Sequence, residues 1–497
     1  MKLARLKLSL LEKIISFRRS NTVRNSFWGF AANGFQSILL SLFYVILARK
    51  YITREFSYFL IANTIYQFLA AISNLGLGQW FTREVVSITD HKILVNKFLK
   101  LQVYSGFFFY IINLTLAFIL YSNSSIRALI ILLGINIIFD NIIYAIKCLN
   151  IARFEQNITF KILVIDSLLK FLIACILFIY PLSIVSLSLC LIFTRFLTLN
   201  FFLKFGSFNN INIIFLYKYK ITWNEIKHIV FKNWPFLVMG SVSIIYWRIG
   251  NIIISKSLTL LDVANYEISF RVFSIAQILP MIVVTSLFPQ LIEIYNKGND
   301  AKFREVSRKY LILSIAYGMF IYTLIYSFAD IIIPFTFGRN YLSTAACTKQ
   351  MFLTILLFPS AVLQAVMLTA MKLEKKDMFL NLISLSVSIL ISIIGLLLVK
   401  SLAVINLSIF ISFLVFHICQ DVILVNRKIT TIKNVSLTYA AIFVPIIVYH
   451  LSALKLQTGI LFPVFWTIII ALIGVVRRMK WSYSPITIAK RTNYPRF

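Results

Sequence analysis

The stretch MFLNLISLSVSILISIIGLLLVKSLAVINLSIFISFLVFHICQDVILV, from Met378 to Val425, indicates most clearly how this chain folds. It contains two apolar runs that are separated by Lys400 and Ser401. A helix of about 20 residues crosses the hydrocarbon core of a bilayer, and each run has that length. Only helices or closed barrels satisfy the backbone groups there. The stretch therefore predicts two consecutive transmembrane helices, at 378–399 and 402–425.

The same pattern recurs along the whole chain, which is 60% hydrophobic and only 13% charged. Charged residues usually make up about a quarter of a soluble globular protein. We therefore predict an all-α integral membrane protein with about 14 transmembrane helices. The predicted spans are 27–48, 56–78, 101–121, 127–147, 162–180, 182–203, 235–255, 265–292, 310–332, 348–370, 378–399, 402–425, 437–453 and 459–476.

The 49 lysines and arginines are distributed unevenly between the hydrophilic breaks. Thirty-six lie on alternate breaks and nine on the breaks between them, while Lys170, Arg195, Arg248 and Arg271 lie inside apolar runs. Cytoplasmic loops accumulate Lys and Arg because insertion holds them back. The cation-rich breaks are therefore predicted to be cytoplasmic, and so are both termini.

The net charge of +32 follows the membrane topology, and no platform of interleaved arginine and aromatic residues indicates nucleic-acid binding. Anionic lipid headgroups at the cytoplasmic leaflet are the expected partners of these cations. The five cysteines form neither a disulfide framework nor a metal-ligand pattern. The glycines contain no phosphate-binding run of the type G-x-x-x-x-G-K-[ST], which excludes ATP-driven transport within this chain.

A weak internal repeat divides the chain. LARKYITREFSYFLIANT resembles ISKSLTLLDVANYEISFRV with Tyr58 aligned to Tyr266, and six spans separate the two copies. An even number of spans keeps the orientation, so the halves are expected to be related by a pseudo-twofold axis along the membrane normal. The predicted organisation is a basic amphipathic N-terminus (1–26), a six-helix bundle (27–203), a cytoplasmic linker (204–234), a second six-helix bundle (235–425), an additional helix hairpin (437–476) and a basic tail (477–497).

Three blocks of sequence resemble one family of transporters. They are SNLGLGQWFTREVV from Ser73, the long block from Asn233 to Leu291, and FGRNYLSTAACTKQMFLT from Phe337. All three are similar to segments of the Wzx-type flippases of O-antigen and exopolysaccharide units, which belong to the polysaccharide transporters of the MOP superfamily. The first outer turn differs from the family, because KYITREFSYF contains no glycine.

The resemblance implies a transporter rather than an enzyme, without cofactor or metal, in the bacterial inner membrane. Its implied cargo is undecaprenyl-diphosphate-linked oligosaccharide, and its implied partners are a polysaccharide polymerase and a chain-length regulator. Two alternatives stay open. A MATE-like multidrug exporter would need an acidic cavity for organic cations, and a membrane polymerase or glycosyltransferase would need acidic groups in a sizeable outer loop, whereas the outer breaks here are short.

The charged residues inside the apolar runs are the candidate site, because each costs roughly 3 kcal/mol or more unless it faces a partner or a cavity. Asp140, Asp166, Lys170 and Arg195 belong to the first half, and Arg248, Glu267 and Arg271 to the second. We predict a cationic, substrate-binding cavity between the bundles. Ion pairing is the alternative role, because Asp166 and Lys170, like Glu267 and Arg271, are spaced i,i+4. Asp140 and Arg195 are expected to pair across helices, whereas Arg248 has no acidic partner in its own helix.

Two further sets of residues are candidates. Arg83 is placed by the family resemblance at the inner mouth, where it would meet the incoming headgroup or anchor the interface. His417 and Asp421, one turn apart near the inner end of a span, are a possible proton or sodium site that couples transport. An interfacial hydrogen bond is the other interpretation of that pair.

Overall fold

The computed structural model describes residues 21–87, 91–206 and 222–482, and every regular element in these ranges is a helix. This confirms the all-α fold class. The helices of the first half are α2 (Asn21–Lys50), α3 (Thr53–Ser73), α4 (Gly78–Ser87), α5 (His91–Leu120), α6 (Ser124–Gly134), α7 (Asn136–Ala152), α8 (Gln156–Ile176) and α9 (Ile184–Phe205).

The second half is built in the same way. Its elements are α11 (Trp223–Lys232), α12 (Trp234–Ser257), α13 (Leu260–Asn296), α14 (Asp300–Phe337), η1 (Arg339–Tyr341), α15 (Thr344–Met351), η2 (Phe352–Leu356), α16 (Phe358–Ala370), α17 (Glu374–Leu398), α18 (Leu402–Asn426), α19 (Ile432–Ala453) and α20 (Thr458–Ser482).

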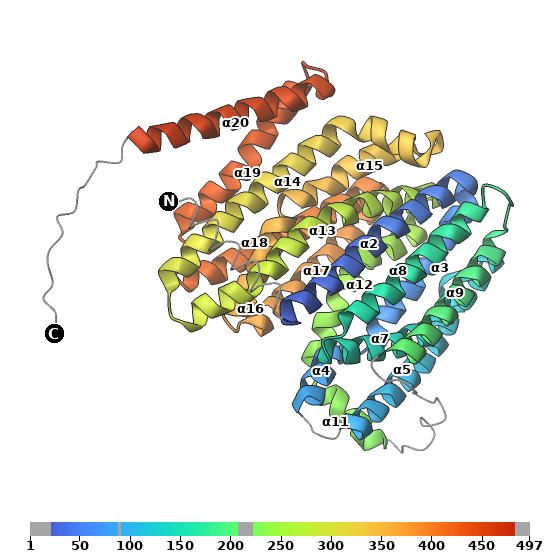
Figure 1. The fold of residues 1–497 in the computed structure, drawn as a ribbon. Helices are drawn as coiled ribbons and strands as arrows, with labels where there is room; N and C mark the ends of the chain where they lie inside the picture. Colours follow the sequence, from blue (N-terminus) through green and yellow to red (C-terminus); the bar gives the residue numbers. More distant parts are fainter. Residues whose placement is uncertain (1–20, 88–90, 207–221, 483–497) are drawn as a thin grey trace, which may run out of the picture.

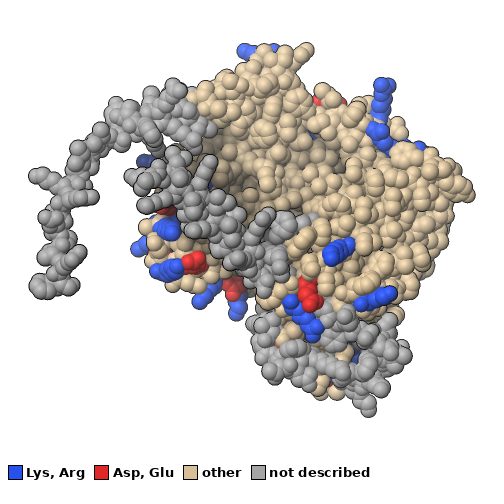
Figure 2. Space-filling model, in the orientation of Figure 1, with Lys and Arg blue, Asp and Glu red and all other residues tan. Residues whose placement is uncertain are grey.

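The described chain has ten helical segments that are long and apolar enough to cross a membrane, judged by length and composition. They are Thr53–Ser73, Ile93–Leu120, Ser124–Ala152, Ile184–Phe205, Leu260–Asn296, Asp300–Phe337, Thr344–Ala370, Glu374–Leu398, Leu402–Asn426 and Ile432–Ala453. Figure 2 shows a broad face of uncharged side chains with Lys, Arg, Asp and Glu gathered mainly along its lower edge. The chain is therefore a multi-pass membrane protein, and the count of fourteen spans stays a prediction.

The helices form two groups that lie side by side (Figure 1). One group contains α2 to α9 and the other contains α12 to α18, and the two meet where α3 packs against α12 and α13. Helix α3 is buried over most of its length, as an element between two groups should be. Helices α19 and α20 pack on α14 (Figure 1), away from the first group.

Two hydrophilic breaks contain short helices that hydropathy did not predict. Helix α4 begins only after a turn, because Leu75 and Gly76 have positive φ angles of 54° and 57°, so the second span ends at Ser73 instead of 78. Helix α11 begins at a capping box formed by Thr222 and Glu225. Lys97 of α5 donates to Glu225 at 2.6 Å, which lowers the pKa of that carboxyl and ties α11 to the first group.

Two predicted spans are interrupted in the structure. The span 127–147 is divided between α6 and α7 at Ile135, and the span 348–370 contains the 3-10 turn η2 between α15 and α16. Pro359 occupies the first turn of α16, where its missing N–H costs nothing. The predicted N-terminal segment 1–26 and tail 477–497 lie largely outside the described residues.

Candidate functional site: a cavity between the two groups of helices

Two adjoining cavities, of about 420 and 340 Å3, lie between the two groups of helices. Tyr66, Gln67, Arg195 and Arg248 line both of them. Helices α3 and α9 contribute the first three of these residues and α12 contributes the fourth, so the space belongs to both groups. The larger cavity is also lined by Asp140, Lys147, Trp247 and Phe270, and the smaller one by Tyr44, Asn63, Lys170 and Arg271.

On the second group's side, Glu267 of α13 serves two arginines. Its Oε1 lies 3.0 Å from Nη1 of Arg248 and 2.5 Å from Nη2 of Arg271. Asn251 donates to Oε2 of the same carboxylate at 3.1 Å and to Thr64 of α3 at 2.9 Å. The side chain of Glu267 is only 2% exposed, so the carboxylate lies behind the arginines, away from the cavity. The spacing of Glu267 and Arg271 predicted their pair, but the partner of Arg248 comes from the neighbouring helix.

Both arginines also lie over aromatic rings. The guanidinium of Arg248 is 5.0 Å from the ring centroid of Phe270, and that of Arg271 is 3.9 Å from the centroid of Tyr44. A ring face stabilises a nearby cation, by about 0.5–2 kcal/mol depending on desolvation. The two guanidinium groups share one carboxylate, and the rings therefore help to hold both of them at the cavity wall.

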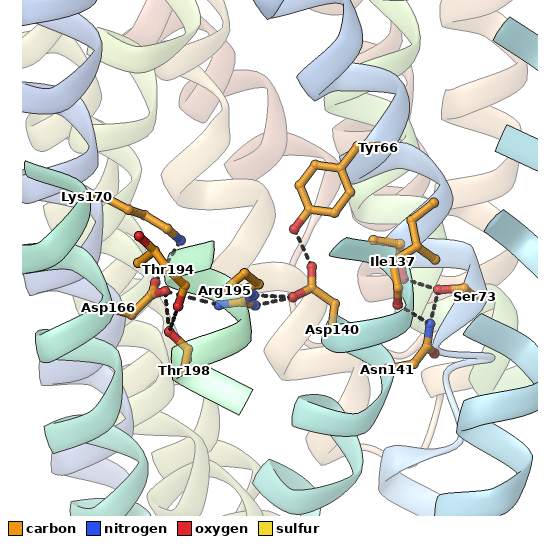
Figure 3. A network of polar contacts seen from close by, with 11 residues as sticks. Tyr66, Ser73, Ile137, Asp140, Asn141, Asp166, Lys170, Thr194, Arg195 and Thr198 are labelled. Atoms are coloured by element: carbon orange, nitrogen blue, oxygen red, sulfur yellow. Dashed lines mark hydrogen bonds and ion pairs between the residues drawn. The ribbon is translucent and has the colours of Figure 1, made fainter. Parts of the chain in front are cut away.

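On the first group's side, Arg195 of α9 lies between two carboxylates (Figure 3). It forms an ion pair with Asp140 of α7 and lies 3.6 Å from Asp166 of α8. Lys170 donates to Asp166 at 2.8 Å, and the hydroxyl of Tyr66 donates to Asp140. The structure thus contains both the i,i+4 pair and the cross-helix pair that the sequence predicts. This network fixes four helices of the first group, α3, α7, α8 and α9, to one another.

The balance of charge at the cavity wall is positive. Among the described residues, five cations line the two cavities and Asp140 supplies the one lining carboxylate. The cations are Lys147, Lys170, Arg195, Arg248 and Arg271. Asp166 and Glu267 are buried behind the wall. Lys147, which the sequence places at the cytoplasmic end of a predicted span, lies inside α7 because this helix continues to Ala152, and it lines the larger cavity.

The remaining candidates lie elsewhere. Arg83 belongs to α4, and its side chain lies outside the described residues. His417 and Asp421 are buried in α18, and Asp421 lines a separate cavity of about 800 Å3 between α14, α16, α18 and α19. The structure therefore brings together seven of the candidates around one space and places the His417 pair in a second region.

The uncharged wall of the cavity was not predicted from the sequence. Tyr66, Gln67, Trp247 and Phe270 line it, yet nothing in their local sequence separates them from other residues of apolar helices. A charged residue stands out in an apolar run because of its cost, whereas an aromatic residue does not. A helix that is apolar all round gives no periodicity from which the cavity-facing side follows.

Solved transporters of the MOP superfamily share this architecture. An inward-facing multidrug resistance transporter of the MATE family superposes with a TM-score of 0.62 at 13% identity, covering 82% of this chain and 94% of its own. The lipid II flippase MurJ in an inward closed conformation gives a TM-score of 0.65 at 16% identity, covering 88% and 97%. A MOP superfamily transporter from Pyrococcus furiosus gives 0.56 at 14% identity, covering 82% and 95%. Identities this low show a common fold and say nothing about cargo.

The sequence itself settles the family. No curated protein is similar enough in sequence to count as a match. The family model described as "Polysaccharide biosynthesis protein" matches residues 46–346, which is more than half of the chain and includes two of the three blocks that resemble Wzx-type flippases. The chain therefore belongs to the polysaccharide biosynthesis protein family, within the fold of the MOP superfamily transporters.

Proposed function

We propose that the chain is a flippase that moves undecaprenyl-diphosphate-linked oligosaccharide across the bacterial cytoplasmic membrane by alternating access. It acts as a transporter and carries out no covalent chemistry. Both termini lie in the cytoplasm, and the cargo leaves the cytoplasmic leaflet for the periplasmic one. The halves 27–203 and 235–425 are the two moving bodies, and the cavity between them is the cargo site.

The observation that carries the proposal is the excess of cations at a cavity shared by both groups of helices. Arg195 and Arg248 line both parts of that cavity from opposite sides. A guanidinium donates two parallel hydrogen bonds to a phosphate, and a low-dielectric wall strengthens them. A diphosphate is therefore the headgroup that these side chains suit best.

Carboxylates stabilise the arginines at the site. An unpaired guanidinium inside a membrane protein is costly, and Glu267, Asp140 and Asp166 form ion pairs with the arginines. A bound diphosphate would take over part of the hydrogen bonding from these carboxylates. Trp247 and Phe270, which line the larger cavity, offer ring faces beside the sugars.

The alternative function is export of organic cations, as in a MATE-like transporter. The described lining has five cations and one carboxylate, which makes the cavity a poor site for a cationic drug. A membrane polymerase or glycosyltransferase is less well supported, because the connections between the outer ends of the described helices are short.

Reconstitution tests the proposed function. The purified chain is placed in proteoliposomes that contain undecaprenyl-diphosphate-linked oligosaccharide with a fluorescent sugar, and a membrane-impermeant quencher measures how much of the label changes leaflet. Transfer of the lipid-linked sugar without uptake of a cationic dye supports the flippase. Dye transport without transfer of the sugar would assign the chain to the exporters.

Replacement of Arg248 by Ala tests the site. Transfer should fall at least tenfold at an unchanged protein level, because the variant removes a guanidinium that lines both parts of the cavity. Arg339→Ala is the matched control, since Arg339 is exposed in η1 and lines neither cavity. Undiminished transfer by Arg248→Ala would remove this residue from cargo binding.

A further inference from the structure

We propose that the cavity of about 800 Å3 between α14, α16, α18 and α19 binds one phospholipid whose anionic headgroup carries hydroxyls, the chemistry of phosphatidylglycerol. The phosphate lies against basic side chains of α14, and an acyl chain follows the apolar wall between α14 and α19. Among the described residues, none that lines this cavity also lines the two cavities of the proposed cargo site. Lipid binding here is therefore independent of the proposed function.

The cavity arises because α19 contacts different helices along its length. In its C-terminal half it is held to α14, where the Tyr322 hydroxyl and Nε2 of His450 are 2.8 Å apart. In its N-terminal half the Tyr439 hydroxyl instead donates to Asp421 of α18, at 3.0 Å. The cavity occupies the space between the N-terminal halves of α14 and α19.

Much of the cavity wall is apolar and accessible from the side. Ile312 and Leu437 are 57% and 58% exposed, and in a membrane such side chains face the acyl chains of the bilayer. The volume falls in the range of about 300–1,000 Å3 that is usual for small-molecule sites. A hydrocarbon chain can therefore enter from the bilayer and lie along Leu311, Ile312, Ile315, Leu363, Leu437 and Ala441.

One end of the cavity is basic. Arg304, Arg308 and Lys309 line it from the N-terminal part of α14, and all three are exposed. Arg304 also donates through Nη1 to the carbonyl of Lys428 at 3.3 Å, which keeps the guanidinium beside the connection between α18 and α19. Arginine binds phosphate through charge-assisted hydrogen bonds, and cations near the headgroup layer attract anionic lipids. This end is suited to the phosphate of a lipid.

Two carboxylates also line the cavity. Asp421 is buried, and its oxygens accept from Gln364 at 2.7 Å and from Tyr439 at 3.0 Å, so it is engaged within the protein. Glu305 is exposed on α14, beside the basic residues. At the exposed end of the described lining, three cations therefore face one carboxylate, and the balance favours an anion.

Two buried polar atoms on the cavity wall have no hydrogen-bond partner within the described part of the chain. They are the hydroxyl oxygen of Ser307 and Oε1 of Gln364, in residues that are only 4% and 3% exposed. Such atoms are costly unless they are paired. The Ser307 hydroxyl can donate to a phosphate oxygen, whereas Oε1 only accepts and needs a donor. A phosphate that carries glycerol hydroxyls supplies both kinds of partner.

Native mass spectrometry of the purified full chain, titrated with lipid, tests the site. We expect one phosphatidylglycerol to bind about tenfold or more tightly than phosphatidylcholine with the same acyl chains, because the cations attract a net negative headgroup. Glycerol 3-phosphate should not displace it, since the acyl chain contributes to binding. Equal affinity for the two lipids, or displacement by glycerol 3-phosphate, would overturn the proposal. Displacement by an equal concentration of undecaprenyl phosphate would do so too, because it would assign the cavity to a polyprenyl chain.

Removal of two cations separates a site from general attraction to charge. Arg304→Gln combined with Arg308→Gln should weaken phosphatidylglycerol binding by about tenfold or more. Lys375→Gln combined with Lys376→Gln is the matched control, because these two exposed lysines of α17 do not line the cavity and their loss changes the net charge equally. The same loss of affinity in both double variants would contradict a defined site.

Ser307→Ala tests the headgroup contact with a readout that a structural role would not give. It removes an unpaired buried hydroxyl, so the thermal midpoint in detergent without added lipid should stay the same or rise, while phosphatidylglycerol binds severalfold more weakly. Unchanged lipid affinity would remove Ser307 from the site and contradict the proposed placement of the phosphate.

A substitution on α19 tests the place of the acyl chain. Ala441→Trp fills part of the apolar wall and should abolish the tight binding of phosphatidylglycerol, although every cation is retained. Ala440→Trp is the matched control, because Ala440 is equally exposed on α19 and does not line the cavity. Tight binding that survives in Ala441→Trp would overturn the assignment of this cavity to a lipid.

Discussion

Arg248 of α12 and Glu267 of α13 form a buried ion pair, with Nη1 3.0 Å from Oε1, at the wall of the cavity between the two groups of helices. Arg271 competes for the same oxygen at 2.5 Å. One carboxylate therefore serves two guanidinium groups, and the surplus positive charge is directed to the cavity. This sharing leaves the arginines paired, yet still able to receive an anion.

The first prediction concerns Glu267→Gln. It leaves two buried guanidinium groups without a full counter-charge, and breaking a buried pair in this way costs about 3–5 kcal/mol. We expect a marked fall in the thermal midpoint of the purified protein, measured by loss of monomer in detergent. Adding soluble diphosphate should restore part of the lost stability, because the anion takes the place of the carboxylate.

Glu293→Gln provides the control for that experiment. Glu293 pairs with Lys297 at the same i,i+4 spacing, but the two side chains are 65% and 69% exposed. Such pairs contribute little, because water and salt screen them. Equal thermal midpoints for the two variants would show that burial of Glu267 does not matter.

The second prediction concerns Arg195→Lys. Arg195 contacts Asp140 and Asp166 through different nitrogens of its planar guanidinium, and the compact ammonium of lysine lacks that spread of donors. We expect normal protein levels and about a tenfold slower transfer of lipid-linked sugar, equal to about 1.4 kcal/mol. Transfer at the original rate would mean that only the charge of Arg195 matters.

The third prediction concerns packing at Gly318 of α14. A Cβ atom at this position would lie 2.7 Å from the backbone oxygen of Ile355 in η2, which cannot move aside as a flexible side chain would. Gly318→Ala should destabilise the protein by about 1–3 kcal/mol. Gly34→Ala in α2 is the control, because its nearest atom is 4.0 Å away, and it should be neutral or stabilising by about 0.5–1 kcal/mol.

The fourth prediction concerns orientation. If the cation-rich breaks are cytoplasmic, alkaline phosphatase fused after Leu258 should be active, and the same enzyme fused after Lys428 should be inactive. Green fluorescent protein fused at these two positions should give the opposite result. Activity of both enzyme fusions, or of the second alone, would contradict the assigned topology.

Much of the fold was predictable from the sequence, because apolar runs of sufficient length have one stable solution in a bilayer. Every predicted span lies within or overlaps a helix of the described chain. The short helices α4 and α11 were not predictable in this way, since they contain polar and charged residues and, at 10 residues each, are too short to cross a bilayer. The turn at Leu75 and Gly76 was also not predicted, because a leucine rarely adopts the positive φ angle that Leu75 has here.

The charged residues of the site could be predicted from the sequence, but which of them form ion pairs could not. Arg248 and Glu267 are conspicuous because charged residues are costly in an apolar helix, but their contact depends on how α12 and α13 are rotated about their axes. The hydropathy of these helices does not encode that rotation. For the same reason, the sequence did not predict that Tyr66 and Gln67 of α3 line both cavities.

The residues shared by the two cavities affect how fast an anionic group could move between them. Because Arg195 and Arg248 border both compartments, a phosphate group can shift from one to the other while retaining a positive neighbour. Such a group would keep a guanidinium beside it while it moves between the two cavities. For the proposed cargo, the rate would then depend chiefly on rearrangement of the helices.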